Sequence, residues 1–96
     1  GYACAFSSGL AAIHTLLSLL PAGAEVVCVD DVYGGVNRLL SKVMPHLQVT
    51  RTPMEQLDQV EAVLKPTTAV VWVETPTNPC LKLVDLAGMA ALIKRH

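Results

Sequence analysis

The 96-residue sequence predicts an α/β fold in which helices flank a mostly parallel β-sheet. Short apolar segments typical of strands alternate four times with segments of helical periodicity. The connections between them are short, which is typical of right-handed crossovers between parallel strands. Hydrophobic residues make up 52% of the chain and charged residues only 16%, which favours part of a larger buried core over a free-standing small domain.

The first half of the chain predicts two strand–helix pairs. Residues 2–6 (YACAF) are short and apolar, and they predict a buried strand. Residues 7–20 predict a helix, because a serine can cap its start and leucine and isoleucine recur at helical spacing. Residues 25–30 (EVVCVD) predict a second buried strand, and residues 33–44 predict a helix that stops before Pro45.

The second half predicts two further pairs. Residues 47–52 (LQVTRT) alternate like a strand, and residues 54–64 form an amphipathic helical pattern. Residues 68–74 (TAVVWVE) are β-branched and apolar, and they predict a buried strand. Residues 84–95 predict a helix with Asp85 near its start and basic residues at its end, an arrangement that the helix dipole favours.

Composition argues against several classes of function. The net charge is −1 and no basic run occurs, so we expect neither a nucleic acid nor a membrane as partner. No apolar segment is long enough to span a bilayer. Cys4, Cys28 and Cys80 are widely separated, and we expect reduced thiols of a cytoplasmic protein with no disulfide set or metal site. His14 and His46 are isolated and are expected to be structural.

Polar clusters follow three of the predicted strands. They are residues 7–10 (SSGL), 30–35 (DDVYGG) and 74–79 (ETPTNP). Ligands of parallel sheets bind outside the C-terminal ends of the strands. We therefore expect the three clusters to converge on one edge of the sheet.

The first cluster has the character of an anion site. The N–H groups of Gly9 and Leu10 open a helix, and the hydroxyl of Ser8 adds a donor, so a phosphate group could bind there. By itself the pattern also fits a plain Ser-capped helix. Neither a GxGxxG fingerprint nor a GxxxxGK[ST] loop is present.

The other two clusters offer an aromatic ring and fixed polar groups. Tyr33 beside two glycines could stack on a flat ligand, or it could be a half-buried residue of an acidic turn. Arg38 could bind a carboxylate or phosphate, or it could simply be solvated. The two prolines of residues 74–79 stiffen the loop, so they either aim Glu74 and Asn78 at a ligand or only end the strand. The Asn78–Pro79 bond is predicted to be cis.

The segments SSGLAA, DDVYGGVNR and ETPTNPCLKLVD, taken together in this order, carry a more specific signal. They resemble the pyridoxal-phosphate enzymes of cysteine and methionine metabolism, the transsulfuration family, over nearly all of the chain. The resemblance implies the large domain of the aspartate-aminotransferase fold, pyridoxal 5′-phosphate as cofactor and a homotetramer. Residues 1–96 are then expected to be a fragment of this one cofactor-binding domain, incomplete at both ends.

The resemblance also implies roles for single residues. One set is implied in cofactor binding: the phosphate loop of Ser8, Gly9 and Leu10, the ring-stacking Tyr33, and Asn78 beside the ring hydroxyl. Tyr33 is further implied in proton transfer. Glu74 is implied near the substrate site, and Arg38 near the distal end of the substrate.

Within the family, the similarity is closest to members that cleave cystathionine at its γ-carbon, giving cysteine, 2-oxobutanoate and ammonia. Methionine γ-lyases carry a cysteine where this chain has Gly35, which argues against them, and Val36 leaves fine substrate preference open. The alternatives are β-carbon lyases, synthases and sulfhydrylases of the family. An alternative of another class is a non-catalytic phosphate- or nucleotide-binding module.

Two parts that the family requires have no counterpart in the chain. They are the Schiff-base lysine and the aspartate that pairs with the pyridine nitrogen, and both are expected beyond His96. The lysines of the chain lack the required motif context; they are Lys42, Lys65, Lys82 and Lys94. The 96 residues alone are therefore expected to be inactive.

Overall fold

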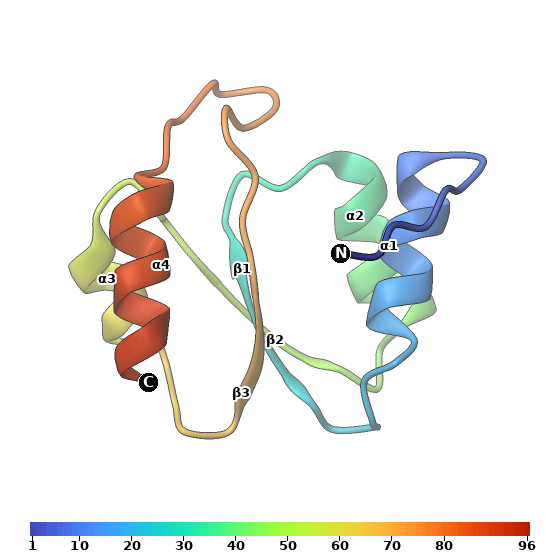
Figure 1. Ribbon diagram of the computed structural model, residues 1–96, viewed down its shortest axis with the longest axis horizontal. Coiled ribbons are helices and arrows are strands. Elements are labelled where there is room, and N and C mark those ends of the chain that lie inside the picture. The colour runs from blue at the N-terminus through green and yellow to red at the C-terminus, as the bar shows by residue number, and fades with distance from the viewer.

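The computed structural model describes all 96 residues and has three layers, a central sheet with two helices on either side (Figure 1). The sheet consists of the parallel strands β1 (Glu25–Val29), β2 (Gln48–Thr52) and β3 (Thr68–Trp72) in the order β2-β1-β3. The predicted α/β class with a parallel sheet is confirmed.

Strand β1 is the centre of the sheet. Val26 pairs with Val49 on one side and with Val70 on the other. The last four residues of β1 are buried, as expected for a β-branched segment covered on both faces. Cys28 lies among them, and burial raises the pKa of its thiol to about 12, so this cysteine is an inert core residue. Strand β3, predicted to be buried, is only half-buried at the edge of the sheet.

Two helices cover each face of the sheet (Figure 1). Helices α1 (Gly9–Leu17) and α2 (Gly34–Arg38) lie together on one face, and α3 (Leu57–Glu61) and α4 (Leu86–Arg95) lie on the other. Side chains cap the two longer helices, because Ser8 accepts from the Ala11 N–H at 3.1 Å and Asp85 accepts from the Gly88 N–H at 3.0 Å.

The second predicted helix is continuous but changes its geometry. Helix α2 passes directly into a π-helix, η1 (Leu39–Val43), which ends before Pro45 as predicted. The third predicted helix is shorter than expected, since only α3 is helical within residues 54–64.

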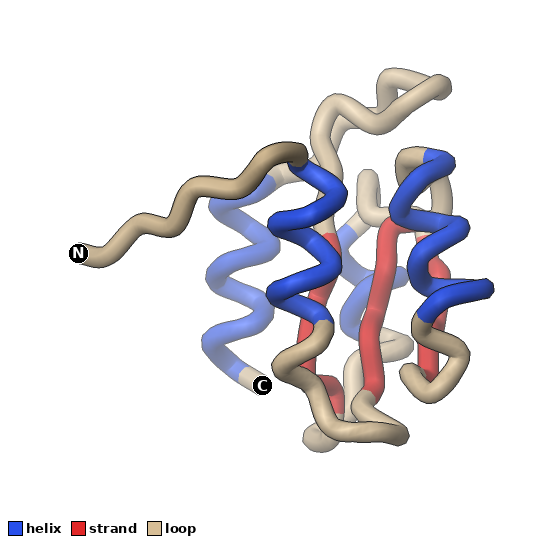
Figure 2. Tube along the Cα trace, turned by 90° about the vertical axis from the view of Figure 1, so that its right-hand side faces the viewer, coloured by secondary structure: helices blue, strands red, loops and turns tan.

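The predicted strand at residues 2–6 is wrong. These residues have no regular structure, are exposed, and extend away from the body of the protein (Figure 2). A strand needs a neighbour to receive its N–H and C=O groups. No other strand of the chain pairs with this segment, so its backbone faces solvent.

Several large apolar side chains are exposed. They include Leu16 in the last turn of α1 and Leu19 just after it, Leu81 and Leu83 before α4, and Leu86 at its start. We expect this surface to make the 96 residues poorly soluble when they are produced alone. None of the helices combines the length and the apolar character that a bilayer span requires.

A valine substitution in β1 tests the role of the central strand. Val29→Ala removes two methyl groups from a fully buried position, so we expect it to lower the free energy of unfolding by about 2 kcal/mol. The matched control is Val43→Ala, because Val43 is 58% exposed and should cost less than about 0.5 kcal/mol. Urea unfolding of the full-length protein measures both, and equal losses would contradict this account of the core.

Candidate functional site

The polar clusters lie at the same end of the sheet. The N-termini of α1 and α2 and the loop that follows β3 all lie beyond the C-terminal ends of the strands, at the top of Figure 1. This arrangement was predicted from the parallel order of the strands. Hydrogen bonds join two of the clusters directly, whereas no hydrogen bond connects the SSGL segment to the others.

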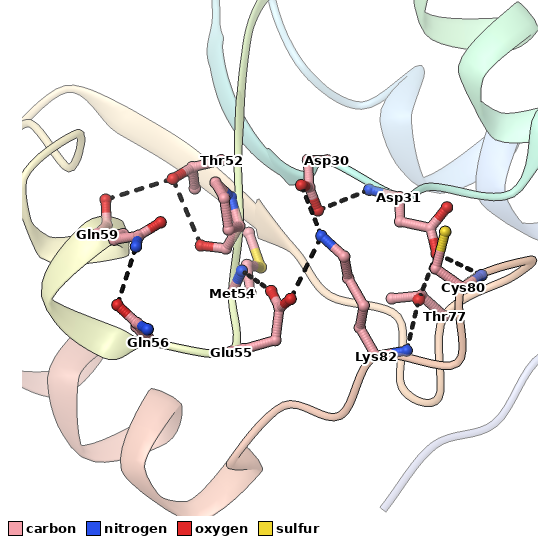
Figure 3. A network of polar contacts seen from close by, with 11 residues as sticks. Asp30, Asp31, Thr52, Met54, Glu55, Gln56, Gln59, Thr77, Cys80 and Lys82 are labelled. Atoms are coloured by element: carbon pink, nitrogen blue, oxygen red, sulfur yellow. Dashed lines mark hydrogen bonds and ion pairs between the residues drawn. The ribbon is translucent and has the colours of Figure 1, made fainter.

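Asp31 ties the loop after β3 to the end of β1 (Figure 3). Its Oδ2 accepts a short hydrogen bond from the Thr77 hydroxyl and another from the Cys80 N–H at 2.9 Å. The Thr77 Oγ1 in turn accepts from the Lys82 N–H at 2.9 Å. Thr77 is only 1% exposed, so it is a buried polar anchor with all of its partners supplied by protein.

Lys82 extends the same network to the end of β2 (Figure 3). Its Nζ lies 2.8 Å from Asp30 Oδ2 and 3.3 Å from Glu55 Oε1. The pKa of Lys82 is raised, chiefly by the hydrogen bond to Asp30, and that of Glu55 is lowered. Lys82 is therefore a charged structural link among the segments that follow three strands.

Tyr33 is the residue just before α2, and its side chain is 51% exposed. Its ring lies against the start of the helix. A Cβ added at Gly35 would lie 2.6 Å from the Tyr33 Cε1 atom, so the ring can occupy this position only because residue 35 is glycine.

The carboxylate of Glu74 accepts hydrogen bonds from two donors of the protein itself. Its Oε2 accepts from the Tyr33 N–H at 2.8 Å, and its Oε1 accepts from the Trp72 Nε1–H at 3.0 Å. The geometry thus brings Glu74 and Tyr33 together. The role of Glu74 near a substrate remains a prediction.

The SSGL segment presents unpaired donors. The N–H groups of Gly9 and Leu10 come too early in α1 to have an acceptor within the helix. Ser8 uses its oxygen for capping, which leaves its hydroxyl proton free to donate. All three residues are exposed.

Asn78 and Arg38 are exposed, and their side chains make no hydrogen bond or ion pair within the chain. The Asn78–Pro79 bond is cis, as predicted, and Thr75–Pro76 is also cis. Both side chains are therefore free to bind a ligand, and their roles in a site stay predictions.

Sequence reasoning missed the residues that hold this edge together. They are Asp31, Thr77, Lys82, Trp72 and Asp30. The signal that could have found Asp31 is its place two residues after the most buried strand, because a carboxylate there must find donors. No comparable signal marks Trp72.

The groups present fit pyridoxal 5′-phosphate. Unpaired N–H groups at the start of α1 suit a phosphate, the half-exposed Tyr33 ring suits a flat pyridine, and the free amide of Asn78 suits a phenolic oxygen. The structure contains no group of three or more His, Cys, Asp or Glu side chains that could hold a metal ion, and its three cysteines are free.

Comparison with known proteins identifies the family. The family model described as Cys/Met metabolism PLP-dependent enzyme matches residues 1–96. The chain belongs to this family. Its members depend on pyridoxal phosphate, so the predicted cofactor and the predicted family are confirmed.

The relatives of the chain are named for different activities. The chain is 42% identical to human cystathionine gamma-lyase over 97 residues, covering 99% of this chain and 24% of the relative. It is 41% identical to a cystathionine beta-lyase of Staphylococcus haemolyticus, covering 99% of this chain and 25% of the relative. The chain thus spans about a quarter of the length of these relatives.

A solved structure agrees with the fold. The cystathionine gamma-lyase of Lactobacillus plantarum, solved with L-serine, matches with a TM-score of 0.91 at 43% identity, covering 95% of this chain and 24% of that chain. The sheet and helices described above are therefore part of the fold of this family.

Substitution of Asp31 tests the anchor of the loop after β3. The pKa of Asp31 is lowered, first by the hydrogen bond from Thr77, so its charged form stabilises the folded state. That stabilisation is complete above the unfolded pKa of 3.8 and is lost as the pH falls through the lower folded pKa. We expect Asp31→Asn to lower the unfolding midpoint of the full-length protein at pH 7.

The difference in unfolding midpoint between wild type and Asp31→Asn should begin to shrink as the pH falls below the unfolded value of 3.8. It should vanish only below the lower folded-state pKa, where both proteins carry a neutral side chain at position 31. Urea unfolding at a series of pH values measures this. Asp58→Asn is the control, because Asp58 is exposed and bonds only within its own helix turn. A constant difference from pH 7 to pH 3 would show that the charge of Asp31 is not the anchor.

Proposed function

We propose that the protein containing this chain is a PLP-dependent carbon–sulfur lyase that cleaves cystathionine, with water, to cysteine, 2-oxobutanoate and ammonia. The observation that carries the proposal is the set of unpaired donors at the start of α1 and the exposed Tyr33 ring at one end of the sheet, in a chain of this family. The human relative named cystathionine gamma-lyase and the glycine at position 35 support the choice of reaction. Residues 1–96 would then be part of the large cofactor-binding domain of a cytoplasmic homotetramer.

Pyridoxal phosphate, when bound, supplies an electron sink for the bonds around the α-carbon of the amino acid. In this proposal Ser8, Gly9 and Leu10 hold its phosphate. Two backbone N–H groups and one hydroxyl would face the phosphate at the positive end of α1, where the helix dipole favours an anion.

The remaining residues would orient the ring and the substrate. Tyr33 would stack on the pyridine, and its hydroxyl would move a proton; the amide of Asn78 would donate to the phenolic oxygen of the ring. Arg38 would hold the distal carboxylate of the substrate, which its exposed and unpaired guanidinium suits.

We propose that the lysine that carries the cofactor lies outside residues 1–96. Lys82 is bound by Asp30 and Glu55, and Lys65 lies 3.2 Å from Glu25, so both are already paired. The relatives are about four times longer than the chain, which leaves ample sequence for this lysine and for the aspartate that faces the pyridine nitrogen.

A β-carbon lyase is the second candidate, because one relative is named cystathionine beta-lyase at nearly the same identity. Incubation of the purified full-length protein with pyridoxal phosphate and cystathionine distinguishes the two. Cleavage at the γ-carbon yields cysteine and 2-oxobutanoate, whereas cleavage at the β-carbon yields homocysteine and pyruvate, and mass spectrometry identifies each product. We expect the first pair.

Homocysteine and pyruvate would replace the proposal by the second candidate. Synthase or sulfhydrylase members would instead form a carbon–sulfur bond, in which the thiol of cysteine or sulfide displaces the leaving group of an activated homoserine. Absence of visible absorbance from bound cofactor, together with nucleotide binding, would favour the non-catalytic module and contradict the proposal.

Two substitutions of Tyr33 separate its ring from its hydroxyl. Tyr33→Ala removes the stacking ring, so we expect cofactor affinity to fall roughly two- to tenfold and turnover to fall further. Tyr33→Phe keeps the ring, so cofactor affinity should change by less than about twofold while turnover falls about 100-fold. Titration followed by absorbance, with steady-state rates, measures both. Equal loss of cofactor in the two variants would mean that stacking is not the role of Tyr33.

A further inference from the structure

The carboxylate of Glu74 bridges the ends of two strands. It accepts from the N–H of Tyr33, which lies four residues after the end of β1, and from the indole of Trp72, the last residue of β3. The two bonds are 2.8 and 3.0 Å long, and each uses a different carboxylate oxygen. Both oxygens are therefore engaged by groups of the protein itself.

The bond to Glu74 is the polar contact that ties Tyr33 to β3, whereas the Tyr33 carbonyl accepts from the Asn37 N–H at 2.9 Å within its own helix. Tyr33 precedes α2, and its side chain makes no capping bond to the helix. Its N–H has no backbone acceptor, so Glu74 is its only partner. Because the ring is half-exposed, burial alone does not fix it, and the position of the backbone decides where the ring lies.

We infer that Glu74 is a positioning residue for Tyr33 and does not bind substrate. This inference rests on the proposed role of Tyr33 in stacking on the cofactor. The carboxylate fixes the Tyr33 backbone relative to β3, and it thereby sets the height of the ring above the end of the sheet. The resemblance to the family had suggested a place for Glu74 beside the substrate.

The chemistry of the two partners allows a sharp test. Both the Tyr33 N–H and the Trp72 Nε1–H can only donate, and a carboxylate can only accept. Glu74→Gln keeps the shape but replaces one acceptor oxygen by an NH₂ group that must face one of the donors. Trp72→Phe removes the indole donor. In the double variant the amide oxygen of Gln can turn to Tyr33 while its NH₂ group meets no opposing donor.

The experiment uses the full-length protein with Glu74→Gln, Trp72→Phe and both changes together. Amide hydrogen exchange at Tyr33 is measured in the cofactor-free protein, and the affinity for pyridoxal phosphate is measured by absorbance titration. We expect Glu74→Gln to speed exchange at Tyr33 and to weaken cofactor binding, each about tenfold or more. In the Trp72→Phe background, Glu74→Gln should change the exchange rate and the cofactor affinity by about threefold or less. If Glu74→Gln fails to fold and the double variant folds, that rescue supports the bridge.

Three results would overturn the inference. One is an increase in KM for the amino-acid substrate with unchanged exchange at Tyr33, which would place Glu74 beside the substrate. Another is a Glu74→Gln change that affects the exchange rate and the cofactor affinity equally with and without Trp72. Failure of both the single and the double variant to fold counts as this result. The third is faster exchange at Tyr33 in a cofactor-free variant that nevertheless binds pyridoxal phosphate as tightly as wild type. Exchange that behaves as expected in a protein that binds no pyridoxal phosphate would instead retain the bridge and reject the proposed function.

Discussion

Parallel pairing of β1 with both neighbours is the constraint on which the rest of the structure depends. Because all three strands run in the same direction, the segments that follow them emerge at one end of the sheet. Strand β1 can lie in the centre because its β-branched side chains are buried on both faces. The residues directly after β1, Asp30 and Asp31, then lie within reach of the loops that follow β2 and β3.

Two kinds of polar residue share this end of the molecule. Charged residues of one kind bind other groups of the protein. Asp31 accepts from the buried Thr77, and Glu74 accepts from the backbone N–H of Tyr33. Lys82 bridges Asp30 and Glu55, which follow different strands. Ser8, Tyr33 and Asn78 remain exposed. A site that must bind an anionic, flat cofactor benefits from this division, because the anchors satisfy their own hydrogen bonds and leave other donors free for the ligand.

The sequence predicted the elements of the fold where they depend on local pattern. Strand β1 and helix α4 follow from β-branched composition and from helical periodicity with a capping aspartate. Residues 2–6 carry an equally apolar pattern, yet they form no strand, because strand formation requires a partner that pattern alone does not reveal. No pattern in the sequence predicts the π-helical geometry of η1.

The residues of the candidate site also fall into a group that local pattern predicts and a group that it does not. The exposed groups were predictable, since hydroxyl, glycine, tyrosine and amide stand directly at the ends of predicted strands. The anchors were not, because each bond joins residues far apart in the chain: Tyr33 to Glu74, Asp31 to Thr77 and Asp30 to Lys82. Such pairs arise from the order of the strands. Glu74 in particular, predicted from the resemblance to lie near the substrate, is also a link within the protein.

The most direct test of this account is the crystal structure of the full-length protein with bound pyridoxal phosphate. We predict that the phosphate accepts from the N–H groups of Gly9 and Leu10, and that the Tyr33 ring lies against the pyridine. Glu74 should still accept from the Tyr33 N–H. A phosphate bound away from the start of α1, or a Glu74 carboxylate turned from Tyr33 toward the ligand, would contradict the account.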